Sequence, residues 1–135
     1  EHAGVMLFCG RMTRGPGRDG RDLGLVDYQY CPRFSYGAVS GLVSVMAGAS
    51  PVSILKETGE LFAFEFVRGD DRIVSAFSLK DKGQLMFESD ASGVTSFDSM
   101  GNRGHVFEGG SAQLQLDGYP RYLVFESATT IKLSD

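Results

Sequence analysis

The stretch Phe62-Ala-Phe-Glu-Phe-Val-Arg-Gly-Asp-Asp-Arg-Ile-Val-Ser-Ala-Phe-Ser-Leu79 decides the fold class. Phe62, Phe64 and Phe66 alternate with other residues, and this period of two places three rings on one face of a strand. The turn signal Gly69-Asp-Asp71 follows, and the residues after it return as a second strand. The stretch therefore predicts an antiparallel β-hairpin.

The same pattern continues to the end of the chain, where turn residues separate short apolar runs. Such spacing predicts an antiparallel β-sandwich of 7–8 strands over residues 51–135. Glu65, Glu88 and Glu126 alternate with apolar neighbours, so we expect them to face outward. We expect most of the following side chains in the core: Phe62, Phe64, Phe66, Phe77, Leu114, Leu123 and Phe125.

On the N-terminal side of the hairpin, a helix is predicted to start after Pro32 and to end near Gly48. No charged residue occurs between Arg33 and Lys56, so we expect this helix to be covered on both sides. One face is expected to pack on apolar groups through Val39, Leu42, Val43 and Met46. The other carries a stripe of small residues that predicts close approach to a neighbouring backbone: Gly37, Gly41, Ser44 and Gly48.

Two earlier segments complete the outline of the chain. The apolar run 4–9 does not alternate, which suits a strand buried on both faces. The Gly- and Arg-rich residues 10–22 after it read as a solvated loop, because Asp19 and Asp22 offset part of its charge. A membrane span over the uncharged stretch 34–55 is not expected, since Pro51 and several Ser and Gly residues interrupt it.

Composition excludes several classes of function. The net charge of −4 gives no electrostatic basis for binding nucleic acid. His2 and His105 lie in different segments without metal-ligand spacing, so no metal site is predicted. Neither a nucleophile elbow nor a phosphate-binding loop is present, and no cofactor is expected. Cys9 and Cys31 can form a disulfide or remain two buried thiols, with the second favoured.

Several motifs in chain order resemble the clan A glycoside hydrolases. Gly24-Leu-Val-Asp-Tyr-Gln-Tyr-Cys-Pro-Arg-Phe-Ser-Tyr-Gly-Ala-Val-Ser looks like the run that enters the eighth helix of their (β/α)8 barrel. Phe62–Leu79 resembles the first hairpin of the β-sandwich that follows the barrel. The stretches Val94–Asn102 and Leu114–Leu123 are similar to the end of that sandwich. Arg33 and Phe34-Ser35 depart from the usual pattern.

The resemblance implies that residues 1–50 are the last strand, loop and helix of the barrel and that 51–135 are a C-terminal β-sandwich. It implies the C-terminal segment of a retaining glycoside hydrolase, whose sandwich supports the catalytic barrel. The catalytic acid/base and nucleophile of this clan precede Glu1, so no catalytic residue is predicted here and the chain alone is expected to be inactive. Arg11 is the candidate at the substrate cleft, by position only.

The implied partners are the rest of the barrel and a carbohydrate substrate, and the resemblance suggests a secreted or periplasmic protein. The alternative is a stand-alone carbohydrate-binding or immunoglobulin-like β-sandwich module. An aromatic platform or a calcium site on the sandwich would favour this alternative. A helix with a bare apolar face would favour the fragment of a larger enzyme.

Overall fold

The computed structural model describes residues 25–27, 30–80 and 82–134. The predicted strand 4–9, the loop 10–22 with Arg11, and Cys9 lie outside these residues. One helix and nine strands follow one another along the chain: α1 (Phe34–Met46), β1 (Ser50–Glu57), β2 (Leu61–Arg68), β3 (Asp71–Ser78), β4 (Gly83–Ser89), β5 (Gly93–Phe97), β6 (Arg103–Glu108), β7 (Ser111–Leu116), β8 (Arg121–Phe125) and β9 (Ile131–Ser134).

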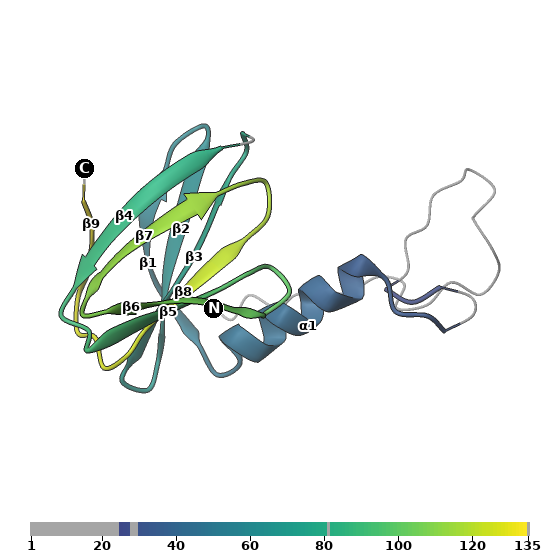
Figure 1. Cartoon of the computed structure of the whole chain (residues 1–135), viewed down its shortest axis with the longest axis horizontal. Helices are drawn as coiled ribbons and strands as arrows, with labels where there is room; N and C mark the ends of the chain where they lie inside the picture. Colours follow the sequence, from purple (N-terminus) through teal and green to yellow (C-terminus); the bar gives the residue numbers. More distant parts are fainter. Residues whose placement is uncertain (1–24, 28–29, 81, 135) are drawn as a thin grey trace.

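The strands form two antiparallel sheets, as the sequence predicts. A six-stranded sheet has the order β1-β2-β3-β8-β5-β6, and a three-stranded sheet has the order β7-β4-β9. Figure 1 shows the two sheets as separate layers, with α1 running outward from one end of the sandwich. The described residues thus hold nine strands where the sequence predicts seven or eight. The additional strand is β1, which pairs with β2 through two register shifts, at Pro51/Ser53 and at Ile54/Lys56.

The main core lies between the sheets. It includes Val74 of β3, Phe87 of β4 and Phe125 of β8, and the rings of Phe87 and Phe125 meet edge to face. Strand β8 is buried on both sides, because Leu123 and Phe125 face this core while Tyr122 and Val124 lie in a second cluster. Burial on both faces gives β8 the continuous apolar run expected of a central strand.

The predicted core is right for three of its seven members. Leu114, Leu123 and Phe125 are buried, but the four phenylalanines of the first hairpin are only half-buried. On β2 the fully enclosed residues are instead Ala63 and Glu65, with Ala63 completely buried in the inter-sheet core. The rings do share one face, as the period of two predicts, but this is the outer face of the six-stranded sheet.

The predicted helix forms over Phe34–Met46, but its packing face differs from the expected one. Gly41 and Val45 are its buried residues, and Met46 packs beside Val45. Leu42 and Val43, expected to make apolar contacts, are exposed in the structure. The helix is therefore covered on one side only by the described residues.

Candidate interaction surface

Helix α1 covers part of the outer face of the six-stranded sheet. Val45 lies in a buried cluster with Ile73, Tyr122 and Val124, to which Met46, Phe66 and Phe97 add partly buried side chains. At the end of α1, the Arg68 guanidinium donates a hydrogen bond of 2.7 Å to the Val45 carbonyl. A cation at the C-terminus of a helix satisfies a carbonyl that has no partner within the helix and opposes the helix dipole. Strand β2 thus holds the end of α1.

The small residues of α1 meet a turn of the sandwich. A Cβ added to Gly41 would lie 2.2 Å from the Met100 carbonyl carbon and 2.5 Å from the Gly101 nitrogen. At Gly37 the nearest atom would be the Met100 sulfur, at 2.9 Å. The predicted close approach of the helix to a neighbouring backbone is confirmed for Gly41, and that backbone belongs to the β5–β6 turn of the same chain.

Asp98 stabilises the conformation of the β5–β6 turn through hydrogen bonds. Asp98 Oδ1 accepts hydrogen bonds from the Met100 and Asn102 backbone N–H groups, at 2.8 and 2.9 Å. Its other oxygen accepts from the Asn102 side-chain amide at 2.9 Å. The Asn102 amide, together with these backbone groups, holds the pKa of Asp98 below its ordinary value. Gly101 adopts a φ of 79°, which favours glycine at this position.

The part of the outer face that α1 leaves uncovered is aromatic. Phe62 and Phe77 stack with ring centroids 5.1 Å apart and an interplanar angle of 12°. The ring centroid of Phe64 lies 6.5 Å from that of Phe62 and 6.4 Å from that of Phe77. Ile54 of β1 pairs with Phe64 across the strands and is 59% exposed. The sequence placed these phenylalanines in the core, and the structure corrects this because the hairpin rings point outward.

A shallow hollow of about 500 Å³ lies beside this cluster, over β1 and β2. It is lined by Pro51, Val52, Ser53, Ile54, Phe64, Glu65 and Phe66. Its walls are mostly apolar, so an apolar side chain of a partner would fit it better than a hydrated polar group.

The uncovered side of α1 extends the apolar character of this side of the molecule. It exposes Tyr36, Leu42 and Val43. Phe34, at the start of the helix, is also exposed but lies on the same helical stripe as Gly41, and its ring centroid is 6.3 Å from that of Tyr119. The segment 34–55 contains no ionisable side chain except that of Tyr36. We call the residues Ile54, Phe62, Phe64 and Phe77, together with Phe34, Tyr36, Leu42 and Val43, the outer apolar surface.

The opposite side of the sandwich is different. The outward residues of the three-stranded sheet are mainly polar: Gln84, Glu88, Ser111, Gln113, Gln115 and Lys132. Gln115 donates a hydrogen bond to Gln84 at 3.1 Å. The outward face of the three-stranded sheet is therefore mainly polar, in contrast to the outer apolar surface. An extended apolar surface on one side of a soluble domain marks a site of interaction.

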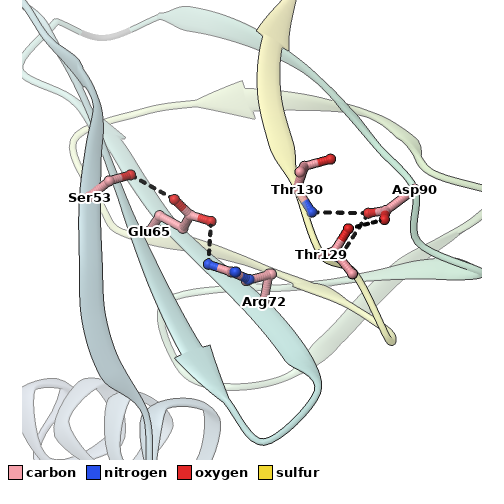
Figure 2. A network of polar contacts seen from close by, with 6 residues as sticks. All are labelled: Ser53, Glu65, Arg72, Asp90, Thr129 and Thr130. Carbon is pink, nitrogen blue, oxygen red and sulfur yellow. Dashed lines mark hydrogen bonds and ion pairs between the residues drawn. The ribbon is translucent and has the colours of Figure 1, made fainter.

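Two other carboxylates, those of Glu65 and Asp90, stabilise the fold through hydrogen bonds (Figure 2). Glu65, expected to face outward, is buried, and it accepts hydrogen bonds from Ser53 at 2.6 Å and from Arg72 at 3.1 Å. These two partners compensate for its burial. Asp90 joins two loops by accepting hydrogen bonds from the Thr129 and Thr130 backbone N–H groups and from the Thr129 hydroxyl. Glu88 and Glu126 are exposed, as expected.

Further expectations from the sequence concern the substrate cleft, the cysteines, metal binding and a membrane span. Arg11, the candidate for the substrate cleft, lies outside the described residues. Cys31 is exposed, whereas the favoured reading has two buried thiols. Within residues 25–27, 30–80 and 82–134, no group of three or more His, Cys, Asp or Glu side chains is placed to hold a metal ion. None of the helices in this part of the chain is long and apolar enough to cross a membrane.

Comparison with solved structures identifies this architecture. A family 39 glycoside hydrolase from the gut symbiont Bacteroides cellulosilyticus WH2 matches 84% of the chain with a TM-score of 0.68 and 19% identity. A GH30 endoxylanase from Clostridium papyrosolvens C71 matches 76% of it with a TM-score of 0.61 and 12% identity. The chain has the fold of part of a glycoside hydrolase.

The match covers only part of each of these enzymes. The chain spans 24% of the family 39 enzyme and 30% of the endoxylanase. No protein-family profile and no curated protein sequence matches the chain. At these identities the likeness concerns the fold, and it agrees with the sequence resemblance to the C-terminal part of clan A enzymes.

Proposed function

We propose that this chain is the C-terminal segment of a retaining glycoside hydrolase, and that its sandwich supports the catalytic barrel through the outer apolar surface. The single observation that carries the proposal is this surface, which has an exposed helix side and a half-buried phenyl cluster on one face. Residues 1–50 would then belong to the barrel, and α1 would lie between the barrel and the sandwich.

The chemistry of the surface favours a protein partner over a sugar. The phenyl rings on β2 and β3 are half-buried and have the exposed Ile54 beside them. A carbohydrate site needs placed hydrogen-bonding groups around its aromatic platform to orient the hydroxyl groups. An apolar partner needs none, and burying such rings contributes about 25 cal/mol per Å² of apolar surface.

In this proposal the glycosidic bond is cleaved by residues outside this chain. A retaining enzyme uses two carboxyl groups about 5–5.5 Å apart, one as nucleophile and one as acid/base. By the sequence resemblance these groups precede Glu1. The contribution of the present chain is to hold the end of the barrel and to cover its apolar surface.

Complementation between two separately produced parts tests the proposal. The 135-residue chain and the remaining part of the parent polypeptide are assayed on aryl glycosides, alone and mixed. We expect turnover to be restored, or strongly increased, only in the mixture. The variant Phe64→Asp should weaken complementation, because it buries an unpaired charge in the interface.

The matched control is Gln113→Asp, which adds the same charge on the polar face of the three-stranded sheet. Equal complementation by both variants would contradict docking through the outer apolar surface. Binding of soluble oligosaccharides by the isolated chain, abolished by Phe64→Asp, would instead identify a carbohydrate-binding module.

A further inference from the structure

Two exposed aromatic rings meet where α1 begins. Phe34, the first residue of α1, is 67% exposed, and Tyr119, in the loop between β7 and β8, is 58% exposed. Their ring centroids lie 6.3 Å apart, and the ring planes are inclined by 60°. The two rings therefore form an angle rather than a flat platform, and their contact leaves much of each accessible to a ligand.

The loop that carries Tyr119 is held in one conformation by hydrogen bonds. Asp117 Oδ1 accepts a bond from the Tyr119 backbone N–H at 2.9 Å, and Asp117 Oδ2 accepts one from the Arg121 guanidinium at 3.0 Å. The Asp117 carbonyl accepts a bond from the Ser78 N–H at 3.0 Å, which ties the loop to the end of β3. A ring on a loop fixed in this way loses little conformational freedom when it binds a ligand.

The same loop offers hydrogen-bonding groups to solvent. The side chains of Asp117 and Arg121 are 38% and 36% exposed, so each reaches water while the two are paired. The carboxylate accepts hydrogen bonds and the guanidinium donates them. A sugar presents C–H groups that stack on aromatic faces and hydroxyl groups that both donate and accept. Aromatic rings beside a donor and an acceptor are therefore suited to a sugar.

We propose that Phe34 and Tyr119, with Asp117 and Arg121 beside them, bind a single glycan chain. This inference rests on the proposed function, in which residues 1–50 belong to the barrel. A helix of such a barrel begins at the face where the strands end, and the active site lies at that face. Because Phe34 begins α1, the two rings lie on the side of the enzyme where the glycan is cleaved. The site holds sugars remote from the cleaved bond, which favours polymeric substrates over short ones.

Charge and ring geometry select the ligand. A protein surface placed over the Asp117–Arg121 pair would remove both charges from water, which costs desolvation free energy, whereas sugar hydroxyls replace the water at these groups. This favours a glycan over the apolar barrel as the occupant. A flat crystalline polysaccharide needs coplanar rings, and rings inclined by 60° cannot both lie on one plane. A single soluble chain can place one sugar against Tyr119 and its edge against Phe34.

Affinity electrophoresis tests the inference. The 135-residue chain is run in native gels that contain soluble xylan, galactomannan or hydroxyethyl cellulose. We expect at least one of these polysaccharides to retard the chain. Tyr119→Ala should weaken this binding by about tenfold, because it removes a stacking ring, whereas Tyr119→Phe should keep most of it. The matched control is Tyr36→Ala, which removes an exposed ring from the other side of α1 and should have no effect.

Migration unchanged by all three polysaccharides would overturn the inference even if complementation through the outer apolar surface succeeds. Retardation that is lost in Phe64→Asp but kept in Tyr119→Ala would place the sugar on the phenyl cluster and would also overturn it. Retardation that depends on Tyr119, without complementation between the two parts, would support the glycan site and count against the docking proposal. Adsorption to crystalline cellulose that depends on Tyr119 would contradict binding of a single chain.

Discussion

The backbone of Gly41 lies directly against the peptide that joins Met100 to Gly101. A Cβ at position 41 would be 2.2 Å from the Met100 carbonyl carbon, a separation that Cβ atoms do not adopt in proteins. This contact joins the middle of α1 to the β5–β6 turn across 59 positions of sequence (100 − 41). It explains why a helix interior retains a glycine, which costs about 1 kcal/mol relative to alanine in helix propensity.

Gly41→Ala should therefore destabilise the isolated chain by about 1–3 kcal/mol, because the turn or the helix must shift to make room for the methyl group. Chemical unfolding of the purified chain measures this change. Ser40→Ala is the matched control, since it lies on the exposed side of the same helix and should be neutral or slightly stabilising. Equal stability of both variants would contradict the contact.

Asp98→Ala should loosen the turn that receives Gly41. The variant loses three hydrogen bonds to a partly exposed carboxylate, and we expect a loss of about 1–2 kcal/mol in the free energy of unfolding. Asn102→Ala removes one of the three and should cost less. Asp70→Ala, in the exposed β2–β3 turn, is the control. Urea titration measures all three, and a ranking with Asp70→Ala as the most damaging would refute this role.

Periodicity predicted which residues share a face but not which face is inside. Phe62, Phe64 and Phe66 do lie together, yet the inter-sheet core takes Ala63 and Glu65 from the alternate positions. The more hydrophobic face of a strand is expected to point inward only when the other face meets water. Here the outer face is covered in part by α1, and in the proposed enzyme by the barrel.

Contacts between residues far apart in the chain could not be predicted from the sequence either. The stripe of small residues on α1 indicated a close neighbour, but only the fold shows that this neighbour is the turn at Met100. Likewise, Glu65 alternates with apolar residues as a solvent-facing residue would. Its burial depends on Ser53 and Arg72, which reach it from the two adjacent strands.

Arg72→Met should destabilise the chain by about 1–3 kcal/mol, because it leaves the Glu65 carboxylate buried with fewer partners. The side chain of Glu65 is 8% exposed and that of Arg72 is 23% exposed, so solvent screens this pair only in part. The double variant Glu65→Leu/Arg72→Met should recover most of the loss, since it removes the buried charge as well. Additive losses in a double-mutant cycle measured by chemical unfolding would show that the two side chains do not act together.

The purified 135-residue chain should not hydrolyse aryl glycosides. Among the carboxylates of the described residues, Glu65 is engaged by Arg72, and Asp90 and Asp98 accept hydrogen bonds that shape their loops. A retaining mechanism needs two carboxyl groups facing one bond across a cleft. Turnover that persists through rigorous purification and is lost on Glu88→Gln or Glu126→Gln would contradict this prediction and place the chemistry in this chain.

Acid should weaken the link between the β4–β5 and β8–β9 loops. The Thr129 hydroxyl, with the Thr130 and Thr129 backbone N–H groups, lowers the pKa of Asp90 to about 2 from its ordinary value of 3.8. Because the folded-state pKa is the lower one, the ionised carboxylate stabilises the fold above pH 3.8. This contribution is lost as the pH falls from there through about 2.

Asp90→Asn should lower the melting temperature at pH 6, and the difference in melting temperature between the variant and the unmodified chain should shrink across this acidic interval. Thermal melts at a series of pH values measure the effect, with Asp70→Asn as the control, and a difference that stays constant down to pH 2 would exclude Asp90 as its source.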